Sequence, residues 1–356
     1  MIPTSSKTTV AAILLAALAT ASPTLTIAPA HATPGPRVSA AAFSRPHQAQ
    51  SAIDARGPGV FPHSVDYDPC SGRFVVGSLA HSTLSTVGPD GTVRTLVDDP
   101  LLVSVQGVSV DSRRHRVLAT NVDYGLADRS SPATKLSVAG VASYDVTSGR
   151  RQWYADLNQV ANDGRQHLLA DLTVAPDGTV YAVDQLTATV FRIDRDGRPS
   201  VLLDHDLLAG TVDIPGFLNG VGSTSVVWLP GNVLIIAKAD GSLVRVPVRR
   251  PELARAVQLS TQLSALTAGI RVLPDGSIAA ISSGLLTGKA AVVQRVRPRD
   301  HWTAATVTVT GNVTDPVTSD LTAGPGGSTF ALSGGLAALL MGQPNDGFTL
   351  RPVDIG

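Results

Sequence analysis

Short apolar runs separated by turns rich in Asp, Pro and Gly fill the chain from about residue 60 onward. A clear example begins at Leu172 and reads LTVAPDGTVYAVDQLTATVFRIDRDGRPSVLLDH. Runs this short, rich in Val and aromatic residues and bounded by turn residues, indicate β-strands rather than helices. The turns PDG, DQLT and DRDG divide this segment into four predicted strands, at residues 172–174, 180–183, 188–193 and 200–203.

The same phrase recurs along the chain. A second clear copy, VDYDPCSGRFVVGSLAHSTLSTVGPDGTVRTLVDD, begins at Val65. Weaker copies begin near Val108, Val226, Ile270 and Leu321. The turns lie roughly 45 to 60 residues apart, which is a spacing typical of propeller blades. Six copies predict an all-β fold, a six-bladed β-propeller with four-stranded antiparallel blades over residues 51–356. A two-sheet β-sandwich is the alternative, but a sandwich needs no repeated turn phrase.

Three details of the ring follow from the same pattern. The last copy is predicted to supply all of its own strands through residues 348–352, so that residues 51–62 either cap the ring or pair beside it. The run SGGLAALLMG from Ser333 is predicted as a buried strand pair. The longest insertions, at residues 121–168 and 207–224, are expected as loops on the ligand-binding face.

The N-terminus predicts export. Residues 1–32 contain Lys7, then the apolar run VAAILLAALATA, and end on Ala30-His31-Ala32. This is the pattern of a secretory signal peptide cleaved after Ala32, so we expect a secreted protein. No Arg-Arg pair precedes the apolar run and no Cys directly follows the cleavage site. Both features favour general secretion without a lipid anchor. Residues 33–50, rich in Pro, Ala and Ser, are predicted to be a disordered linker.

Composition excludes several functions. Basic and acidic residues both number 28, and no block of Lys and Arg stands out, so nucleic acid is not an expected partner. Apart from the signal peptide, no run approaches the roughly 20 apolar residues of a membrane span. Glu occurs only at position 252, which suits a chain with little exposed helix. Cys70 is the single cysteine, so no intramolecular disulfide can form.

Four segments resemble SMP-30/gluconolactonase-like proteins: PHSVDYDPCSGRFVVGSL, LTVAPDGTVYAVDQLTATVFRID, PGFLNGV and VTDPVTSDLTAGPGG. The resemblance covers nearly all of the chain after residue 60. It implies a six-bladed propeller with a divalent cation, often calcium, at one mouth of the central channel. In that family a Glu, an Asn of an Asn-Gly phrase and an Asp of an Asp-Gly phrase hold the cation. A cation held by such oxygen ligands can polarise a lactone carbonyl or activate water.

The residues that the resemblance assigns to this site are only partly present. The Asn-Gly phrase is Asn219-Gly220, but His63 stands at the position of the Glu. The Asp-Gly phrase reads Ala268-Gly269, so its carboxylate is missing. Calcium affinity depends largely on the number of carboxylates around the ion. The family's calcium site is therefore expected to be degenerate in this chain.

A replacement metal site is a hypothesis. Asp171 and Asp320 occupy the same place in two copies, DLTVAPDG and DLTAGPGG, and equivalent positions of a propeller point to the same end of the channel. These two residues could then converge with His63 and Asn219 as metal ligands. A His with carboxylates suits zinc or manganese better than calcium. In the alternative interpretation, each Asp accepts hydrogen bonds from nearby backbone N–H groups.

Two functions remain open. One is hydrolysis of a lactone or similar small ester at the channel mouth, by a metal-bound water. The other is a non-catalytic propeller that binds a small molecule, glycan or protein on its loop face. No residue is predicted as a catalytic nucleophile, since no Ser stands in a G-x-S-x-G phrase. The remaining histidines are expected at the surface: His81, His115, His167, His205 and His301.

Overall fold

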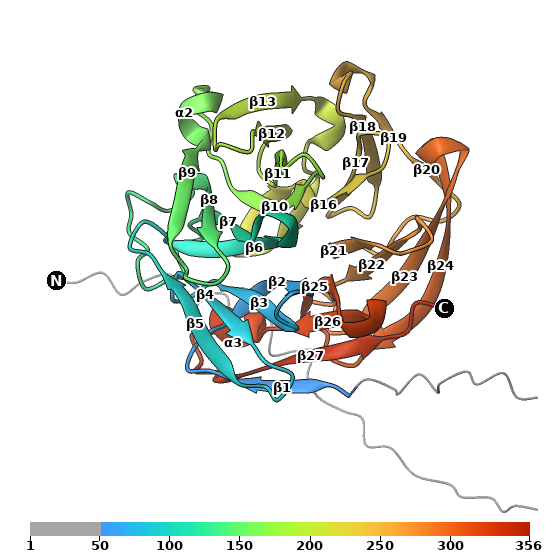
Figure 1. The fold of residues 1–356 in the computed structure, drawn as a ribbon. Coiled ribbons are helices and arrows are strands. Elements are labelled where there is room, and N and C mark those ends of the chain that lie inside the picture. The colour runs from blue at the N-terminus through green and yellow to red at the C-terminus, as the bar shows by residue number, and fades with distance from the viewer. Residues whose placement is uncertain (1–50) are drawn as a thin grey trace, which may run out of the picture.

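The computed structural model describes residues 51–356. These residues form a ring of small β-sheets around a central channel (Figure 1). The predicted signal peptide (1–32) and linker (33–50) lie outside the described residues. Within them, five blades have four strands and one has five. The predicted six-bladed, all-β propeller is therefore confirmed, and the sandwich alternative is wrong.

The strands of blades 1 to 3 follow the chain from the axis outward. Blade 1 consists of β2 (Pro62–Asp68), β3 (Arg73–Ser78), β4 (Thr83–Val87) and β5 (Val93–Asp98). Blade 2 consists of β6 (Ser104–Asp111), β7 (Arg116–Val122), β8 (Ala139–Asp145) and β9 (Arg151–Asp156). Blade 3 consists of β10 (Leu169–Val174), β11 (Val180–Asp184), β12 (Thr189–Ile193) and β13 (Pro199–Asp204).

Blades 4 and 5 keep the same order, and the fifth adds one strand. Blade 4 consists of β16 (Ser223–Leu229), β17 (Val233–Lys238), β18 (Leu243–Pro247) and β19 (Arg255–Ala256). Blade 5 consists of β21 (Thr267–Val272), β22 (Ile278–Ser282), β23 (Ala291–Arg299) and β24 (Ala304–Val313), with β20 (Gln258–Leu259) parallel to β24 at its edge.

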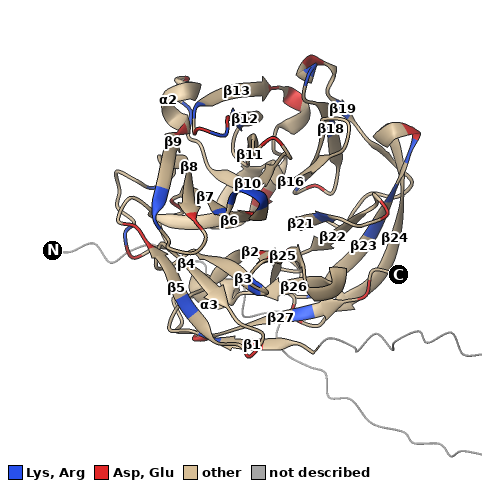
Figure 2. Cartoon of the chain, viewed as in Figure 1, with Lys and Arg blue, Asp and Glu red and all other residues tan. Residues whose placement is uncertain are grey.

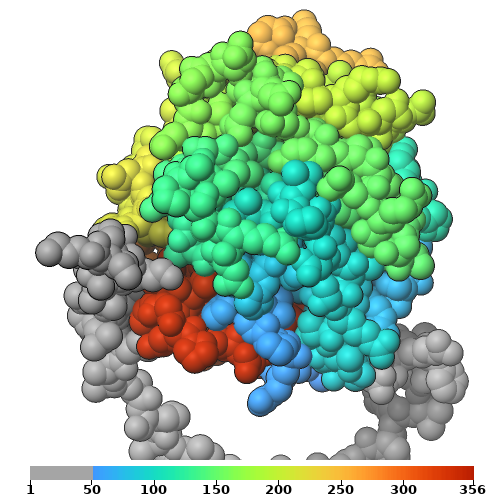
Figure 3. All heavy atoms as spheres, turned by 90° about the vertical axis from the view of Figure 1, so that its left-hand side faces the viewer, coloured from blue at the N-terminus to red at the C-terminus, as the bar shows by residue number. Residues whose placement is uncertain are grey.

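Blade 6 closes the ring with strands from both ends of the described chain. It consists of β25 (Thr318–Ala323), β26 (Thr329–Ser333), β27 (Gly347–Val353) and β1 (Ile53–Arg56). Strand β1 pairs antiparallel with β27, with Ile53 opposite Leu350. Figure 3 shows the blue and red segments side by side on the surface. The expectation that the last copy supplies all its own strands is wrong. The C-terminal copy provides only three strands of blade 6. The fourth strand is β1, whose apolar face is buried.

Packing between blades accounts for the apolar runs in the sequence. The second strand of a blade has both faces covered by neighbouring blades, and every residue of β7, β11, β22 and β26 is buried. Outer strands such as β13 are largely exposed. Continuous apolar runs therefore mark second strands, as expected of strands buried on both faces. The buried apolar residues form six clusters, which lie mainly between adjacent blades.

Two segments outside the blades shape one end of the channel. The insertion after blade 3 forms a hairpin of β14 (Val212–Ile214) and β15 (Leu218–Val221). The run LAALL forms the helix α3 (Leu336–Leu340), so its prediction as part of a strand pair is wrong. Gly335 has a φ of +78°, which ends the extended backbone after β26, and Ala and Leu then favour a helical turn. A second short helix, α2 (Leu157–Ala161), follows blade 2.

Basic positions (Lys and Arg) and acidic positions (Asp and Glu) are both distributed around the ring (Figure 2). No helix among residues 51–356 combines the length and apolar character needed to cross a membrane.

Ring closure by β1 can be tested with a buried and an exposed position of that strand. Ala55 is 1% exposed, whereas Asp54 points outward. We expect Ala55→Lys to lower the free energy of unfolding by about 2–4 kcal/mol, because it buries an unpaired charge. Asp54→Lys should change it by no more than about 0.5 kcal/mol. Urea denaturation measures both, and equal effects of the two substitutions would contradict the pairing.

Candidate functional site

Each innermost strand carries a register shift near its beginning, and the residue inside the shift faces one end of the channel. The shifts occur in β2, β6, β10, β16, β21 and β25. Such bulges re-aim a side chain. The six residues involved are His63, Gln106, Ala170, Thr224, Ala268 and Ser319, and all six line one cavity of about 100 Å³. We call this cavity the mouth pocket.

The walls of the mouth pocket are apolar and come from the long insertions. Tyr124 and Leu126 come from the insertion of blade 2, and Phe217 comes from the β14–β15 hairpin. The rings of Tyr124 and Phe217 stack with centroids 5.5 Å apart and an interplanar angle of 16°. The amide of Gln185 donates a hydrogen bond to the Tyr124 hydroxyl. Residues of both predicted insertions therefore meet at this end of the channel. The prediction of residues 121–168 as one loop is wrong, because this segment also contains β8, β9 and α2.

The floor of the mouth pocket holds buried polar atoms without partners. Among the described residues, Gln106 Oε1 and Ser319 Oγ are two of four buried side-chain atoms that make no hydrogen bond. Their residues are only 6% and 4% exposed. An unsatisfied buried polar atom costs about 1–3 kcal/mol. Native structures seldom tolerate that cost without a ligand or an ordered water at the atom.

His63 is neutral at this position. Burial lowers its pKa to about 4, although a hydrogen bond with the backbone of Gln106 opposes the shift. Its Nε2 lies 3.4 Å from Gln106 Nε2. Because neutral imidazole has one nitrogen without a proton, we assign Nε2 as the acceptor of this contact and the Gln106 amide as its donor. Gln106 Oε1 is then left free to accept a hydrogen bond from a ligand.

Below the mouth pocket, hydrogen bonds between blades connect the six innermost strands in two groups of three. The residues that follow the bulges are, from blade 6 round to blade 5, Asp320, Ser64, Gly107, Asp171, Ser225 and Gly269. The order Asp–Ser–Gly thus occurs twice, and the two Asp residues lie in opposite blades. The two copies that contain the phrase DLT in the sequence are therefore those of opposite blades, 3 and 6.

Each carboxylate bonds to the next blade in the same way. Asp320 Oδ2 accepts hydrogen bonds from Ser64 Oγ at 2.8 Å and from Val65 N at 3.0 Å. Ser64 Oγ in turn accepts one from Val108 N of blade 2. One carboxylate thereby connects three blades.

The second triplet repeats these bonds. Asp171 Oδ2 accepts from Ser225 Oγ at 2.6 Å and from Val226 N at 3.0 Å, and Ser225 Oγ accepts from Ile270 N of blade 5. One triplet joins the innermost strands of blades 6, 1 and 2, and the other joins those of blades 3, 4 and 5. Gly107 and Gly269 contribute no side-chain bond.

The third position of each triplet is Gly because the neighbouring strand approaches too closely for a side chain. A Cβ on Gly269 would lie 2.6 Å from Asp320 Oδ1 and 3.0 Å from Leu321 N. A Cβ on Gly107 would lie 3.1 Å from Ala170 O and from the Asp171 Cα. The Ala-Gly phrase at 268–269, read in the sequence only as a lost carboxylate, therefore has a packing role.

These carboxyl groups are half-buried and mutually repulsive. Burial raises the pKa of Asp171 to about 6, against its hydrogen bonds with Ser225 and two backbone N–H groups. Burial, together with the charge of Asp171, raises the pKa of Asp320 well above its ordinary value. Both residues line a polar cavity of about 170 Å³ farther along the channel, together with Asp66 and Arg271.

The structure does not bring the four hypothesised metal ligands to one point. His63 lines the mouth pocket, Asp171 and Asp320 line the polar cavity beyond it, and Asn219 is exposed on β15. In the part of the chain that the structure describes, no three His, Cys, Asp or Glu side chains are grouped so that they could hold a metal ion. The hydrogen bonds of the two Asp residues are those of the alternative interpretation, extended to the next blade. The donor set does not fit a divalent cation.

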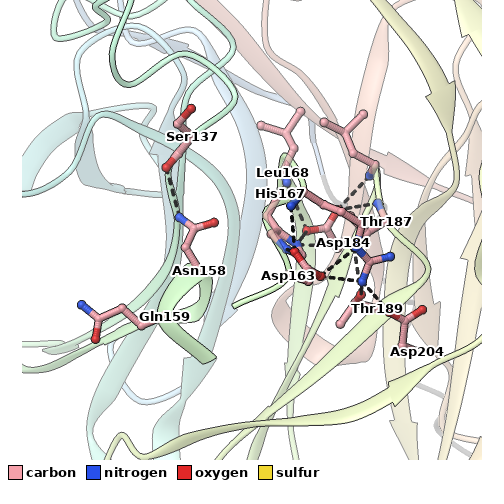
Figure 4. A network of polar contacts seen from close by, with 12 residues as sticks. Ser137, Asn158, Gln159, Asp163, His167, Leu168, Asp184, Thr187, Thr189 and Asp204 are labelled. Carbon is pink, nitrogen blue, oxygen red and sulfur yellow. Dashed lines mark hydrogen bonds and ion pairs between the residues drawn. The ribbon is translucent and has the colours of Figure 1, made fainter. Parts of the chain in front are cut away.

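Sequence reasoning missed a buried histidine network, shown in Figure 4. His167 is fully buried, so its prediction as a surface residue is wrong. Its Nδ1 lies 3.0 Å from Asp184 Oδ2 and its Nε2 lies 3.1 Å from Asp163 Oδ1. Burial alone would lower the pKa of His167, but the two carboxylates outweigh it and raise the pKa.

This network positions a wall of the mouth pocket. Asp184 also accepts hydrogen bonds from the backbone N–H groups of Leu168 and Thr187. It thereby fixes the turn that contains Gln185, the partner of Tyr124. The His167 side chain does not line the mouth pocket, so its role is structural. In the sequence, the only signal for this histidine network is the presence of acidic residues at 163 and 184. Their contact with His167 depends on the fold.

The fold and site define a six-bladed propeller with a pocket of about 100 Å³ at one end of its channel. Comparison with known proteins agrees with that class. No known family model and no curated protein matches the sequence. Among solved structures, the chain is similar to the major allergen Mala s 1 of Malassezia sympodialis, with 15% identity and a TM-score of 0.68 over 85% of this chain and 96% of that one.

Two enzyme structures are also similar. A streptogramin B lyase has 12% identity and a TM-score of 0.54, over 84% of this chain and 97% of that one. The gluconolactonase XC5397 of Xanthomonas campestris has 16% identity and a TM-score of 0.51, over 86% and 87%. Gluconolactonases are thus among the structural relatives, as the sequence resemblance implied. Identities this low show a shared fold alone.

The close approach at the axis predicts a position-specific effect of one methyl group. We expect Gly269→Ala to lower the free energy of unfolding by about 1–3 kcal/mol, because the new Cβ overlaps Asp320. Gly311→Ala is the matched control, since a Cβ there meets nothing within 4 Å. Thermal denaturation of both variants provides the measurement, and equal melting temperatures would refute the packing role.

The raised pKa of Asp171 predicts a pH-dependent contribution to stability. The folded state holds this proton more tightly than the unfolded state, so ionisation is destabilising. The unfolding free energy of the wild type, minus that of Asp171→Asn, should therefore fall as the pH rises from about 4 through about 6. His63 titrates in both proteins and contributes to both curves. Urea denaturation at several pH values gives the difference, and parallel curves would contradict the shift.

Proposed function

We propose that this propeller binds a small, largely apolar molecule in the mouth pocket through one neutral hydrogen-bonding group, and does not transform it. The observation that carries the proposal is the pair of unpartnered polar atoms, Gln106 Oε1 and Ser319 Oγ, at the floor of an apolar cavity. Small-molecule sites typically combine apolar walls with a few placed polar groups.

The chemistry of the lining favours a neutral polar group on the ligand. No Asp, Glu, Lys or Arg belongs to the described lining of the mouth pocket, and His63 is uncharged at neutral pH. A carboxylate or ammonium would lose its hydration there without gaining a counter-charge. A hydroxyl group can donate to Gln106 Oε1 or accept from Ser319 Oγ. An alcohol therefore suits either atom.

Lactone hydrolysis, the other function considered from the sequence, has less support. It needs a cation at the channel mouth, and Asp171 and Asp320 already accept hydrogen bonds from the next blade and do not line the mouth pocket. Gluconolactonase activity belongs to the Xanthomonas relative, whose fold this chain shares. Secretion, with cleavage after Ala32, is part of the proposal and places the binding domain outside the cell.

The proposal is tested with benzyl alcohol and with toluene, the matched hydrocarbon that lacks the hydroxyl. We expect the wild type to bind the alcohol at least about fivefold more tightly, since a net hydrogen bond contributes about 1 kcal/mol. Ser319→Ala and Gln106→Met should remove this preference. Ser319→Ala should also stabilise the ligand-free protein by up to about 1 kcal/mol, because it removes an unsatisfied atom. Gln106→Met should not, because it also removes the donor to His63 Nε2. Titration calorimetry and thermal denaturation give the two readouts.

The matched control is Ser223→Ala. Ser223 Oγ is also buried and unpartnered, but it does not line the mouth pocket, so the preference for the alcohol should persist. Equal affinity of the wild type for both compounds would overturn the proposal. So would turnover of sugar or acyl lactones, with calcium, manganese or zinc added, that is lost in His63→Ala.

A further inference from the structure

A second, larger cavity lies beside the mouth pocket. We call it the side pocket; its volume is about 580 Å³, within the range of small-molecule sites. Its walls come from the β14–β15 hairpin, residues 284–288, residues 315–317 and α3. Ile214, Phe217 and Leu285 line both pockets, so these side chains separate the two.

The side pocket is apolar except for two carboxylates and one amide. Its apolar side chains include Phe217, Leu285, Leu286, Ala338, Leu340 and Met341. Asp213 lies on β14, Asp315 precedes β25, and Asn345 provides the amide. None of the described residues that line it is Lys, Arg or His. The cavity thus combines an apolar interior with uncompensated negative charge.

Both carboxylates keep one oxygen available. Asp213 Oδ1 accepts a hydrogen bond from Gly220 N at 2.8 Å, and Asp315 Oδ1 accepts one from Val317 N at 2.9 Å. Neither residue takes part in an ion pair with any described side chain. The backbone bonds hold the carboxylates in place, while Oδ2 of each stays free for a positively charged group.

We propose that the side pocket binds an apolar cation, a molecule with an ammonium group on a hydrocarbon body. The hydrocarbon contacts the Leu, Ala and Met side chains, where its burial removes apolar surface from water. The ammonium is attracted to Asp213 and Asp315, and Phe217 offers an aromatic face that attracts cations. This site goes beyond the proposed function, because it is a different cavity and selects the opposite kind of polar group.

The test compares two amphiphiles of the same chain length, decyltrimethylammonium and decanesulfonate, as monomers in titration calorimetry with the full chain. The cation should bind at least about tenfold more tightly than the anion. Adding salt should reduce that preference, since charge attraction near the surface is screened. Equal binding of the two amphiphiles, or tighter binding of the sulfonate, overturns the proposal.

Variants then assign the preference to the two carboxylates. The double variant Asp213→Asn with Asp315→Asn keeps the side-chain oxygens that accept from the backbone N–H groups but removes both charges. Cation affinity should therefore fall at least about fivefold. The matched control is Asp196→Asn, which removes a charge from an exposed turn of blade 3 that does not line the cavity. Unchanged affinity in the double variant, or an equal loss in the control, refutes the assignment.

Two further variants separate this site from the mouth pocket. Ala338→Phe should fill the side pocket and weaken binding of the cation, with circular dichroism showing that the fold persists. Ser319→Ala, which tests the proposed function, should leave cation binding unchanged. If Ser319→Ala weakens the cation and Ala338→Phe does not, the cation occupies the mouth pocket and the side-pocket proposal fails.

Discussion

Hydrogen bonds between the innermost strands of neighbouring blades are the interactions on which the rest of the molecule depends. One Asp–Ser–Gly triplet joins blades 6, 1 and 2 and the other joins blades 3, 4 and 5, and each Asp reaches across to the backbone of the next blade. Carboxylates withdrawn from water are costly unless they are hydrogen-bonded. Here each one connects strands that no sheet hydrogen bond joins. The six bulge residues that line the mouth pocket lie directly before the residues of the two triplets in the chain.

Much of the fold could be predicted from the sequence because its signals are local. The strands predicted at 172–174, 180–183, 188–193 and 200–203 fall on β10 to β13, since each turn phrase terminates a strand on its own. Ring closure could not be predicted, because nothing local in β1 specifies a partner at the other end of the chain. The run LAALL is too short for its apolar pattern to distinguish strand from helix, and Gly335 decided the outcome.

The candidate site was predicted in part. The sequence placed Asp171 and Asp320 at equivalent positions and put the long insertions on the binding face, and both features are present in the structure. The actual bonding of the carboxylates could not be foreseen, because their partners Ser64 and Ser225 belong to other blades. Gln106 and Ser319 were not singled out for the same reason. A buried atom without a partner is a property of three-dimensional packing and has no signature in the chain.

The pairing of β1 with β27 also has a consequence for biosynthesis. A ribosome makes the first strand of the outer pair long before the last, so blade 6 cannot form until nearly the whole described chain has been synthesised. Until β27 has been made, β1 has no partner strand, and the apolar cluster formed by residues of blades 6 and 1 is incomplete. The seam between blades 6 and 1 is therefore the last part of the ring to close.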